Sequence, residues 1–190
     1  MTWATTEVSD ELSIKYLLFK ERYNRDTNQW QKLRNSYHPN PSKTHIEITW
    51  FQGDVDGFVN GSQSMTSRGT GTVHTICPIE VHLMGDKAVT GSTGSISIPF
   101  SYEGQQYDCN SFTRFISRLQ KVDGKWNLLM LEAIYDRDSI ASVLPSAQVD
   151  CRIPLGSRES YKCSAWLLGQ KGFNIKQDLP AVDVLLLVII

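Results

Sequence analysis

Features that mark nucleic-acid-binding, membrane-spanning and metal-binding proteins are missing from this sequence of 190 residues. Its 19 Lys and Arg residues are balanced by 20 Asp and Glu residues, and no basic cluster occurs, so neither nucleic acid nor a membrane surface is an expected partner. The aliphatic run VLLLVII at residues 184–190 is too short to cross a bilayer as a helix, which needs about 20 residues. No Cys/His spacing typical of a metal site is present, and we expect no metal.

Cysteine is scarce, and a secretion signal is missing. The N-terminal segment MTWATTEVSDELS has no basic region followed by an apolar run. No CxxC pair occurs, so we interpret the cysteines as buried free thiols of a cytosolic protein. Both observations favour a cytoplasmic location. The four residues concerned are Cys77, Cys109, Cys151 and Cys163.

The composition is that of a globular domain. Hydrophobic residues make up 41% and charged residues 21% of the chain, which is long enough to bury a core without metal or disulfide bonds. We expect residues 1–145 to form one α+β domain, and residues 146–190 to form a C-terminal extension with one helix and the aliphatic tail. The tail could add a strand or contact a partner.

Apolar residues at intervals of three and four predict helix within residues 7–35. Leu12, Tyr16, Phe19 and Tyr23 form the apolar stripe, which Leu17 and Leu18 widen. The segment NRDTN at 24–28 is expected to break the helix, because its side chains compete for backbone hydrogen bonds. A second short helix with Trp30 and Leu33 would end before HPNPS at 38–42.

From residue 45 the pattern changes to strands and hairpins, with a weakly helical stretch at 53–66. Turn residues at Gly85-Asp86-Lys87, Tyr102-Glu103-Gly104 and Asp123-Gly124 separate the later strands. Residues 136–156 are expected to connect the last strand to a helix at 157–173 that begins at Ser157. Helices followed by a curled antiparallel sheet indicate an α+β fold. The predicted strands are 45–51, 72–84, 88–100, 106–122 and 126–135.

His74 is the histidine with the clearest potential for chemistry. Strict alternation places it on one face with Ile76, and places Ile79, Val81 and Leu83 on the other. A β-bulge at Cys77-Pro78 would bring both sets onto one inward face. An inward imidazole could transfer protons near neutral pH, or it could be a core histidine with its hydrogen bonds satisfied. We expect His82 to face solvent beside Glu80.

Two carboxylates are of interest, and each has two interpretations. Asp26 lies at the break between the first two helices, where it could cap the second helix, orient an imidazole, or do both. Glu132 ends an apolar face formed with Trp126, Leu128 and Met130, which suggests a cavity mouth or a buried acid. The alternative for Glu132 is a solvated residue at a strand end.

Further side chains are candidates for lining a pocket. They are Arg114, Tyr107 and Tyr102. Arg114 and Glu132 lie on strands joined by one hairpin, so they could pair in the pocket or form a plain cross-strand salt bridge. Most aromatic residues are expected in the core, with a few, Trp50 among them, forming the wall of an apolar ligand site.

The order of these segments resembles a known group. A helix, DTNQW, a strand, TVHTICPIEVHLMGDKAVTGS and KVDGKWNLLMLEAIYDRD, spread over roughly residues 7–140, resemble the SnoaL-like group of the nuclear transport factor-like superfamily, and most closely small fungal enzymes of secondary metabolism. The resemblance implies a curved antiparallel sheet wrapped around helices as a cone, with an apolar cavity at its open end. It also implies acid–base catalysis without a cofactor, and a homo-oligomer, most commonly a dimer.

The resemblance places Asp26 on the family's orienting aspartate and His74 on the histidine that it orients. Two positions depart from scytalone dehydratase, a member of the superfamily. Phe100 stands near the place of a second catalytic histidine, and Arg25 stands at the place of a tyrosine unless Tyr23 takes that role through a small shift. Scytalone itself is therefore not an expected substrate.

The resulting prediction is a cofactor-independent lyase or isomerase. It would dehydrate, cyclise or rearrange a hydrophobic polycyclic intermediate such as a polyketide, terpenoid or alkaloid. His74 and Asp26 would be catalytic, and the remaining candidates would bind substrate. The alternative is a non-catalytic ligand-binding or dimerisation module with the same fold. The substrate-binding candidates are Glu132, Arg114, Tyr107, Tyr102 and Trp50.

Overall fold

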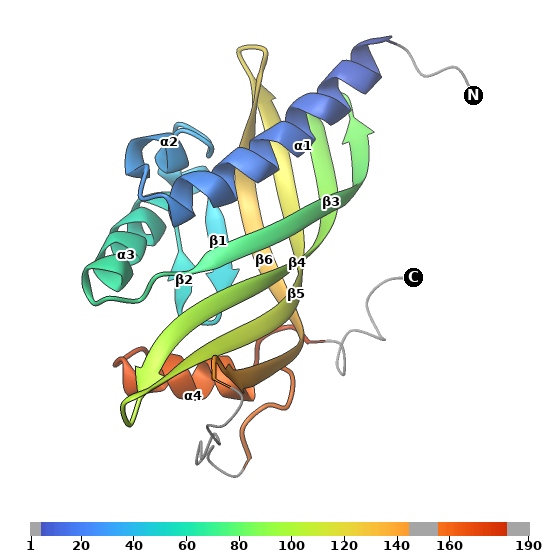
Figure 1. The fold of residues 1–190 in the computed structure, drawn as a ribbon. Helices are drawn as coiled ribbons and strands as arrows, with labels where there is room; N and C mark the ends of the chain where they lie inside the picture. Colours follow the sequence, from blue (N-terminus) through green and yellow to red (C-terminus); the bar gives the residue numbers. More distant parts are fainter. Residues whose placement is uncertain (1–4, 145–155, 182–190) are drawn as a thin grey trace.

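Helices at the N-terminal end of the chain lie across the concave side of a curved sheet, as Figure 1 shows. The structure is a computed structural model that describes residues 5–144 and 156–181. The helices are α1 (Thr5–Asp26), α2 (Trp30–Arg34), α3 (Val55–Ser67) and α4 (Lys162–Gln170). A short 3-10 helix, Pro41–Lys43, precedes the first strand.

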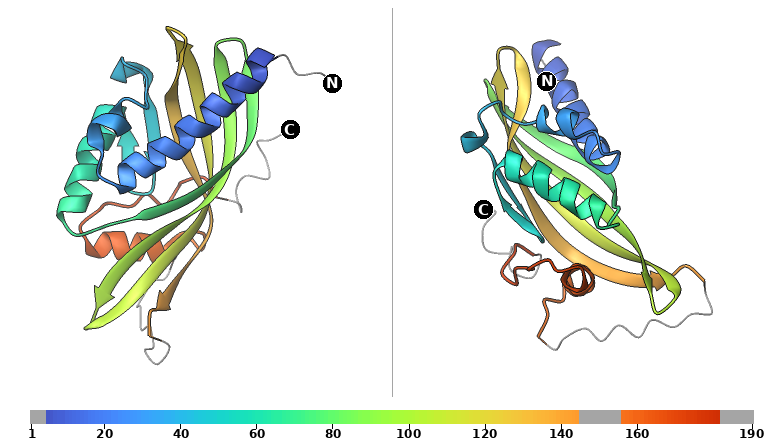
Figure 2. Two further views of the ribbon diagram at one scale, coloured as in Figure 1. Left: turned by 45° about the horizontal axis from the view of Figure 1, so that its top comes forward. Right: turned by 90° about the vertical axis from the view of Figure 1, so that its left-hand side faces the viewer.

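A single six-stranded sheet forms the body of the domain, with the order β2-β1-β6-β5-β4-β3. Neighbouring strands are antiparallel except β1 and β6, which are parallel. The views in Figure 2 show how the long strands curve around the helices. The predicted α+β cone is therefore confirmed. The strands are β1 (His45–Ile48), β2 (Phe51–Gly53), β3 (Val73–Met84), β4 (Lys87–Tyr102), β5 (Gln105–Val122) and β6 (Lys125–Ser142).

A bulge in β3 determines which of its side chains face the cavity. The pairing of β3 with β4 shifts between Pro78 and Glu80, one residue beyond the predicted position. Ile76, Val81 and Leu83 consequently pack on the same core, as predicted. Ile79 was predicted inward but is 55% exposed, because it is the extra residue of the bulge.

The face of α1 that meets the sheet is not the predicted apolar stripe. The predicted stripe of Leu12, Tyr16, Phe19 and Tyr23 is exposed. The helix instead buries a stripe with the same spacing that contains three charged residues. Those charges can be buried because they have partners within the cone. The buried residues are Ile14, Leu18, Glu21, Arg22 and Arg25.

Several predicted boundaries need correction. The strand predicted at 45–51 is two strands, β1 and β2, paired through a tight turn. The last strand continues to Ser142 instead of giving way to a connector at 136, because its pairing with β5 extends to Tyr107. The last helix begins at Lys162 and not at Ser157. The stretch predicted at 53–66 to be only weakly helical contains the full helix α3, and the short helix predicted around Trp30 is confirmed.

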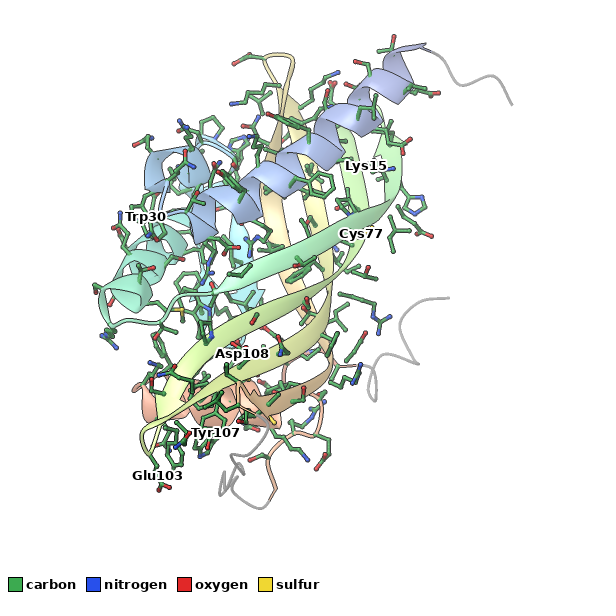
Figure 3. The ribbon with its side chains drawn as sticks, in the orientation of Figure 1. Lys15, Trp30, Cys77, Glu103, Tyr107 and Asp108 are labelled. Carbon is green, nitrogen blue, oxygen red and sulfur yellow. The ribbon has the colours of Figure 1, made fainter. Side chains whose placement is uncertain are left out.

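The cysteine prediction is correct only in part. Cys109 and Cys163 are buried, whereas Cys77 is exposed on the edge strand β3, as Figure 3 shows. Cys77 precedes the bulge and alternates with the inward-facing His74 and Ile76, so the thiol lies on the outward side of the strand. Cys151 and the VLLLVII tail lie outside the described residues.

Helix α4 packs across one end of the sheet. A second hydrophobic cluster joins it to β4 and β5. No helix among the described residues is long and apolar enough to span a membrane. The residues of this cluster are Ile98, Phe100, Tyr107, Cys109, Cys163, Trp166 and Leu167.

Candidate active site

Two segments 48 residues apart meet at the inner surface of the cone. Nδ1 of His74 lies 2.7 Å from Oδ1 of Asp26, and the backbone N–H of His74 donates to Oδ2 of Asp26 at 2.7 Å. Asp26 is the last residue of α1, and His74 is the second residue of β3. Both oxygens of the carboxylate are therefore used to hold one histidine. The predicted capping role for Asp26 is wrong, since Gln29 occupies the N-cap position of α2.

The electrostatic environment favours a neutral imidazole beside an ionised carboxylate. Burial lowers the pKa of His74 to about 4, and the nearby charges of Arg25 and Arg22 act in the same direction, whereas the hydrogen bond that His74 donates to Asp26 acts to raise it. Burial alone would raise the pKa of Asp26, but its bonds to His74 and the charge of Arg25 lower it. An ionised carboxylate only accepts hydrogen bonds, so Nδ1 of His74 carries the proton and Nε2 has a free lone pair.

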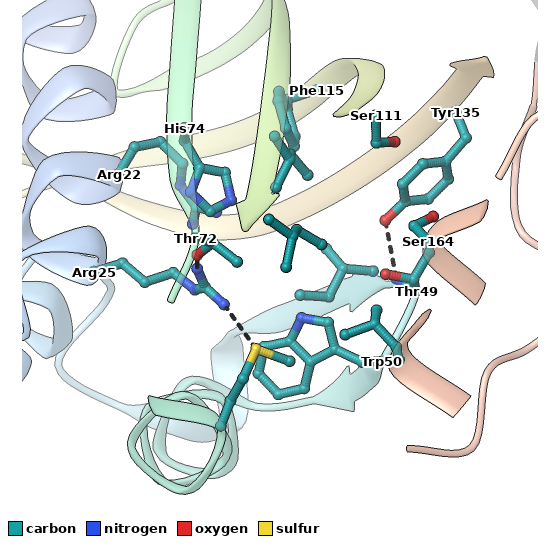
Figure 4. Close-up of a pocket in the computed structure, with 15 residues that line it drawn as sticks. Arg22, Arg25, Thr49, Trp50, Thr72, His74, Ser111, Phe115, Tyr135 and Ser164 are labelled. Carbon is teal, nitrogen blue, oxygen red and sulfur yellow. Dashed lines mark hydrogen bonds between the residues drawn. The ribbon is translucent and has the colours of Figure 1, made fainter. Parts of the chain in front are cut away.

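This lone pair faces a cavity. A cavity lies between the helices and the concave face of the sheet. His74 points into it, as Figure 4 shows, and Arg22 and Arg25 lie at the same end. Its walls are mainly apolar. The apolar lining consists of Ile48, Trp50, Met65, Ile96, Ile98, Phe115 and Leu168.

Arg25 is the cation of this cavity that keeps a hydrogen-bond donor without a partner among the described residues. It donates to Oγ1 of Thr72 at 2.5 Å and lies 3.7 Å from Oδ1 of Asp26. Its Nε–H has no hydrogen-bond partner in the described part of the chain. Burial lowers the pKa of Arg25 to about 10, which still leaves it protonated at neutral pH. Arg25 therefore brings positive charge to the cavity wall, together with a donor that no described residue satisfies.

Arg22 is held differently, by a buried network. Its Nε and Nη2 both bind the carboxylate of Glu21, and the hydroxyl of Tyr37 donates to Oε1 of the same carboxylate at 2.8 Å. All three residues are buried. Because Glu21 compensates its charge, Arg22 contributes mainly shape and local potential to the cavity wall.

Of the predicted substrate-binding residues, the structure brings only Trp50 to the cavity. Its ring stacks on Phe58 with a centroid distance of 5.9 Å, and Arg25 lies 5.7 Å from its ring centre. Tyr107 and Tyr102 instead contact the second cluster: Tyr107 stacks on Phe100, and Tyr102 packs against Trp166. Figure 3 shows Tyr107 beside α4.

Glu132 and Arg114 lie on the outer face of the sheet and do not form the predicted pair. Arg114 binds Asp136, with Nη2 and Oδ1 2.9 Å apart. A second bulge, where Leu119 pairs with Leu128 and Arg118 with Met130, reverses the parity of β6. Glu132 therefore no longer shares a face with Trp126 and Leu128. Burial, and next the charge of neighbouring Glu47, raises the pKa of Glu132.

Sequence reasoning missed much of the polar lining. Arg22 and Arg25 belong to the buried stripe of α1, and an i, i+3 spacing of arginines beside Glu21 was a signal for it. Ser164 and Leu168 come from α4, which no local pattern connects to the cavity. Tyr23 is exposed, so Arg25 and not Tyr23 occupies the cavity position next to Asp26.

The comparisons with known proteins agree with this architecture. A family model described as a SnoaL-like domain matches residues 6–131. A protein of Fusarium vanettenii described as pea pathogenicity protein 2 is 24% identical over 183 residues, which is 90% of this chain and 77% of that protein.

Two solved structures show the same fold at low identity. A putative scytalone dehydratase from Novosphingobium aromaticivorans superposes with a TM-score of 0.59 at 18% identity, over 81% of this chain and 98% of that one. A hexachlorocyclohexane dehydrochlorinase of type 3 from Novosphingobium barchaimii gives a TM-score of 0.59 at 11% identity, over 76% and 97%. The fold of this chain is thus shared with proteins described as a putative scytalone dehydratase and a dehydrochlorinase.

Proposed function

Because the chain belongs to the SnoaL-like family, we propose that it is a cofactor-independent acid–base catalyst, a lyase or isomerase. Its substrate would be a hydrophobic polycyclic intermediate of fungal secondary metabolism. One observation carries the proposal: His74 is held at Nδ1 by Asp26 and faces an apolar cavity with Nε2. The apolar lining favours a hydrophobic substrate, and the Fusarium relative favours a fungal source.

The proposed reaction begins with proton transfer from carbon. Nε2 of His74 takes a proton from a carbon next to an electron-withdrawing group, and Asp26 stabilises the imidazolium that forms. The electron pair left on the substrate then expels a leaving group from the neighbouring carbon, which is a lyase reaction. Alternatively, the imidazolium returns the proton to a different carbon, which is an isomerisation.

We assign the charge-stabilising role to Arg25, whereas the sequence had offered Arg114 and Tyr107 as substrate-binding candidates. Removing a proton next to a carbonyl places negative charge on its oxygen. The guanidinium of Arg25, beside the His74–Asp26 pair and with a free N–H, is suited to stabilise that charge. A positioned base contributes about 10²–10⁴ in rate, and one donor to an oxyanion about 10²–10³.

A general carbon acid tests the proposal before the natural substrate is known. Nitrobenzisoxazole loses the proton on its ring carbon to a base, its N–O bond breaks, and a coloured cyanophenolate forms. We expect the protein to accelerate this reaction with saturation kinetics. His74→Ala should abolish the acceleration. Asp26→Asn should reduce it about 10²-fold or more, because an amide can donate to Nδ1 and move the ring proton to Nε2.

Controls separate catalysis from binding. His82→Ala removes an exposed histidine outside the cavity and should leave the rate unchanged. Probe binding and the urea midpoint are measured for every variant. If His74→Ala binds the probe and converts it as fast as the unmodified protein does, the proposal is wrong, and the non-catalytic ligand-binding module is the better interpretation.

A further inference from the structure

The wall of the cavity away from His74 carries a hydroxyl group with no internal partner. Ser111, on β5, lines the cavity and is 1% exposed. Its Oγ forms no hydrogen bond within the described part of the chain. Figure 4 shows this hydroxyl beside Tyr135, on the opposite side of the cavity from His74 and Arg25. A buried hydroxyl without a partner is costly, so a group inside the cavity is its natural partner.

Tyr135 supplies a second donor at the same place. Its hydroxyl oxygen accepts the backbone N–H of Thr49 at 2.9 Å, and no acceptor for its own proton is found among the described residues. Burial raises the pKa of Tyr135 to about 12, so the phenol keeps this proton throughout the neutral range. Ser111 and Tyr135 together therefore present donors to an oxygen of a bound molecule.

Strand register sets how far this pair lies from the base. His74 on β3 pairs with Ile96 on β4, and Ile96 pairs with Ser111 on β5, so the three residues form one row across the concave face. Adjacent strands lie about 4.8 Å apart, which separates His74 from Ser111 by about 10 Å. Ile96 forms the apolar floor between them. A fused two-ring or three-ring skeleton would span this row.

Helix α4 covers the end of the cavity where Ser111 and Tyr135 lie, and the hydrogen bonds of its Ser164 do not involve the hydroxyl groups of these two residues. The backbone N–H of Ser164 donates to Oδ2 of Asp138 at 2.7 Å, and the Ser164 hydroxyl donates to the carbonyl of Tyr161 at 3.1 Å. Ser164 and Leu168 line the cavity. The hydrogen bonds of Ser164 are thus made inside the protein, and its hydroxyl donates to Tyr161 and not into the cavity.

We propose that Ser111 and Tyr135 form a recognition subsite for an oxygen substituent on the end of the substrate remote from the reactive carbon. The substrate class is then an oxygenated fused-ring compound: an acidic C–H next to a carbonyl lies at His74 and Arg25, and a hydroxyl or ketone on the far ring lies at Ser111. The assignment of the reactive end rests on the proposed function. The subsite itself rests on the unpartnered donors and the strand register.

The test compares two ligands that differ only at the far end. α-Tetralone carries one carbonyl on a fused bicycle, and its analogue has an added hydroxyl on the aromatic ring, para to the carbonyl. Binding of each to the full chain is measured by titration. We expect the added hydroxyl to improve affinity about threefold to tenfold, the worth of one hydrogen bond. Ser111→Ala should remove this gain and leave the affinity for α-tetralone unchanged.

Three further variants complete the design. Tyr135→Phe should reduce the same gain, although it also deprives the Thr49 N–H of its acceptor. Ser117→Ala, the same change at another buried serine of β5 outside this cavity, should preserve the gain. His74→Asn should also preserve it, because the added hydroxyl is expected away from the base.

The absence of any gain from the added hydroxyl would overturn the subsite, and so would either of two results with the variants. One is a gain that persists in Ser111→Ala, and the other is a gain that disappears in His74→Asn, which would place the hydroxyl at the base. Failure of the proposed function is a separate result. If the protein does not accelerate the nitrobenzisoxazole reaction but shows a Ser111-dependent gain in affinity, the subsite is supported and the proposed function is wrong. If the protein accelerates the reaction but the added hydroxyl does not improve affinity, only the subsite is wrong.

Discussion

Replacing His74 by Asn should change how the stability of the protein depends on pH. In the folded protein, burial and the charges of Arg25 and Arg22 lower the pKa of the imidazole from the ordinary 6.5 to about 4. Between these two pH values the unfolded chain binds a proton that the folded chain does not. Protonation therefore stabilises the unfolded state, and stability falls as the pH decreases from 6.5 to about 4.

The magnitude follows from the two pKa values. Each tenfold change in a protonation equilibrium is worth about 1.4 kcal/mol, so the full effect is about 3 kcal/mol below about pH 4, and about 2 kcal/mol is already lost at about pH 5. His74 is 5% exposed, so solvent screening is weak. Protonation of Asp26, whose pKa is lowered, also reduces the stability of the fold as the pH falls, but only in more acidic solution. Measurements above about pH 4.5 separate the two groups.

The assay is urea unfolding of the unmodified protein and the variant at about pH 7.5 and about pH 5. Asn lacks the titrating ring but retains an N–H donor for Asp26. We expect the unmodified protein to lose about 2 kcal/mol more than the variant over this interval. His82→Asn, which removes an exposed imidazole, is the control for loss of a histidine elsewhere. Parallel pH dependences, or an imidazole NMR signal of His74 that titrates near 6.5, would refute the reasoning.

Three other changes have definite expected outcomes. Arg25→Gln should lower the plateau rate with nitrobenzisoxazole about 10²-fold and move the acid limb of the pH–rate profile to higher pH, because a charge that lowers the pKa of the base is removed. Glu21→Gln should destabilise the protein by about 3–5 kcal/mol in urea unfolding, since it leaves the charge of Arg22 buried without compensation. Gly94→Ala should cost about 1–3 kcal/mol, because the new Cβ would lie 2.6 Å from a backbone oxygen of β3; Gly91→Ala, with its nearest atom at 4.0 Å, should stay within about 0.5 kcal/mol. A stable Glu21→Gln protein, or equal effects at the two glycines, would contradict these packing arguments.

Local sequence signals were sufficient to predict most of the helices, strands and turns. Turn residues fixed the three long hairpins: Gly85, Gly104 and Gly124 all adopt positive φ angles, where glycine is favoured. The change from helical to alternating periodicity located the border between the helices and the sheet. The bulge in β3 was predictable because a proline interrupts the strand, and it was misplaced by only one residue.

Periodicity alone did not identify the buried face of α1. A helix with apolar residues on one side and paired charges on the other has two faces that could be buried. In this protein the face with the paired charges packs against the sheet. Glu21, Arg22 and Tyr37 satisfy one another only when the cone closes over them. The bulge at the start of β6 had no proline or glycine to mark it, and it moved Glu132 to the outer face.

By itself, the sequence determined most of the element types and the three hairpin turns, and its resemblance to the SnoaL-like group pointed to Asp26 and His74, whose pairing the structure shows. Only the tertiary structure decided which other side chains surround them. The cavity is lined by residues of α1, α3, α4 and the concave faces of the strands. These elements lie far apart in the sequence. Such a site is fixed by strand curvature and bulges, which are set by packing between distant segments and leave little trace in any short stretch of the chain.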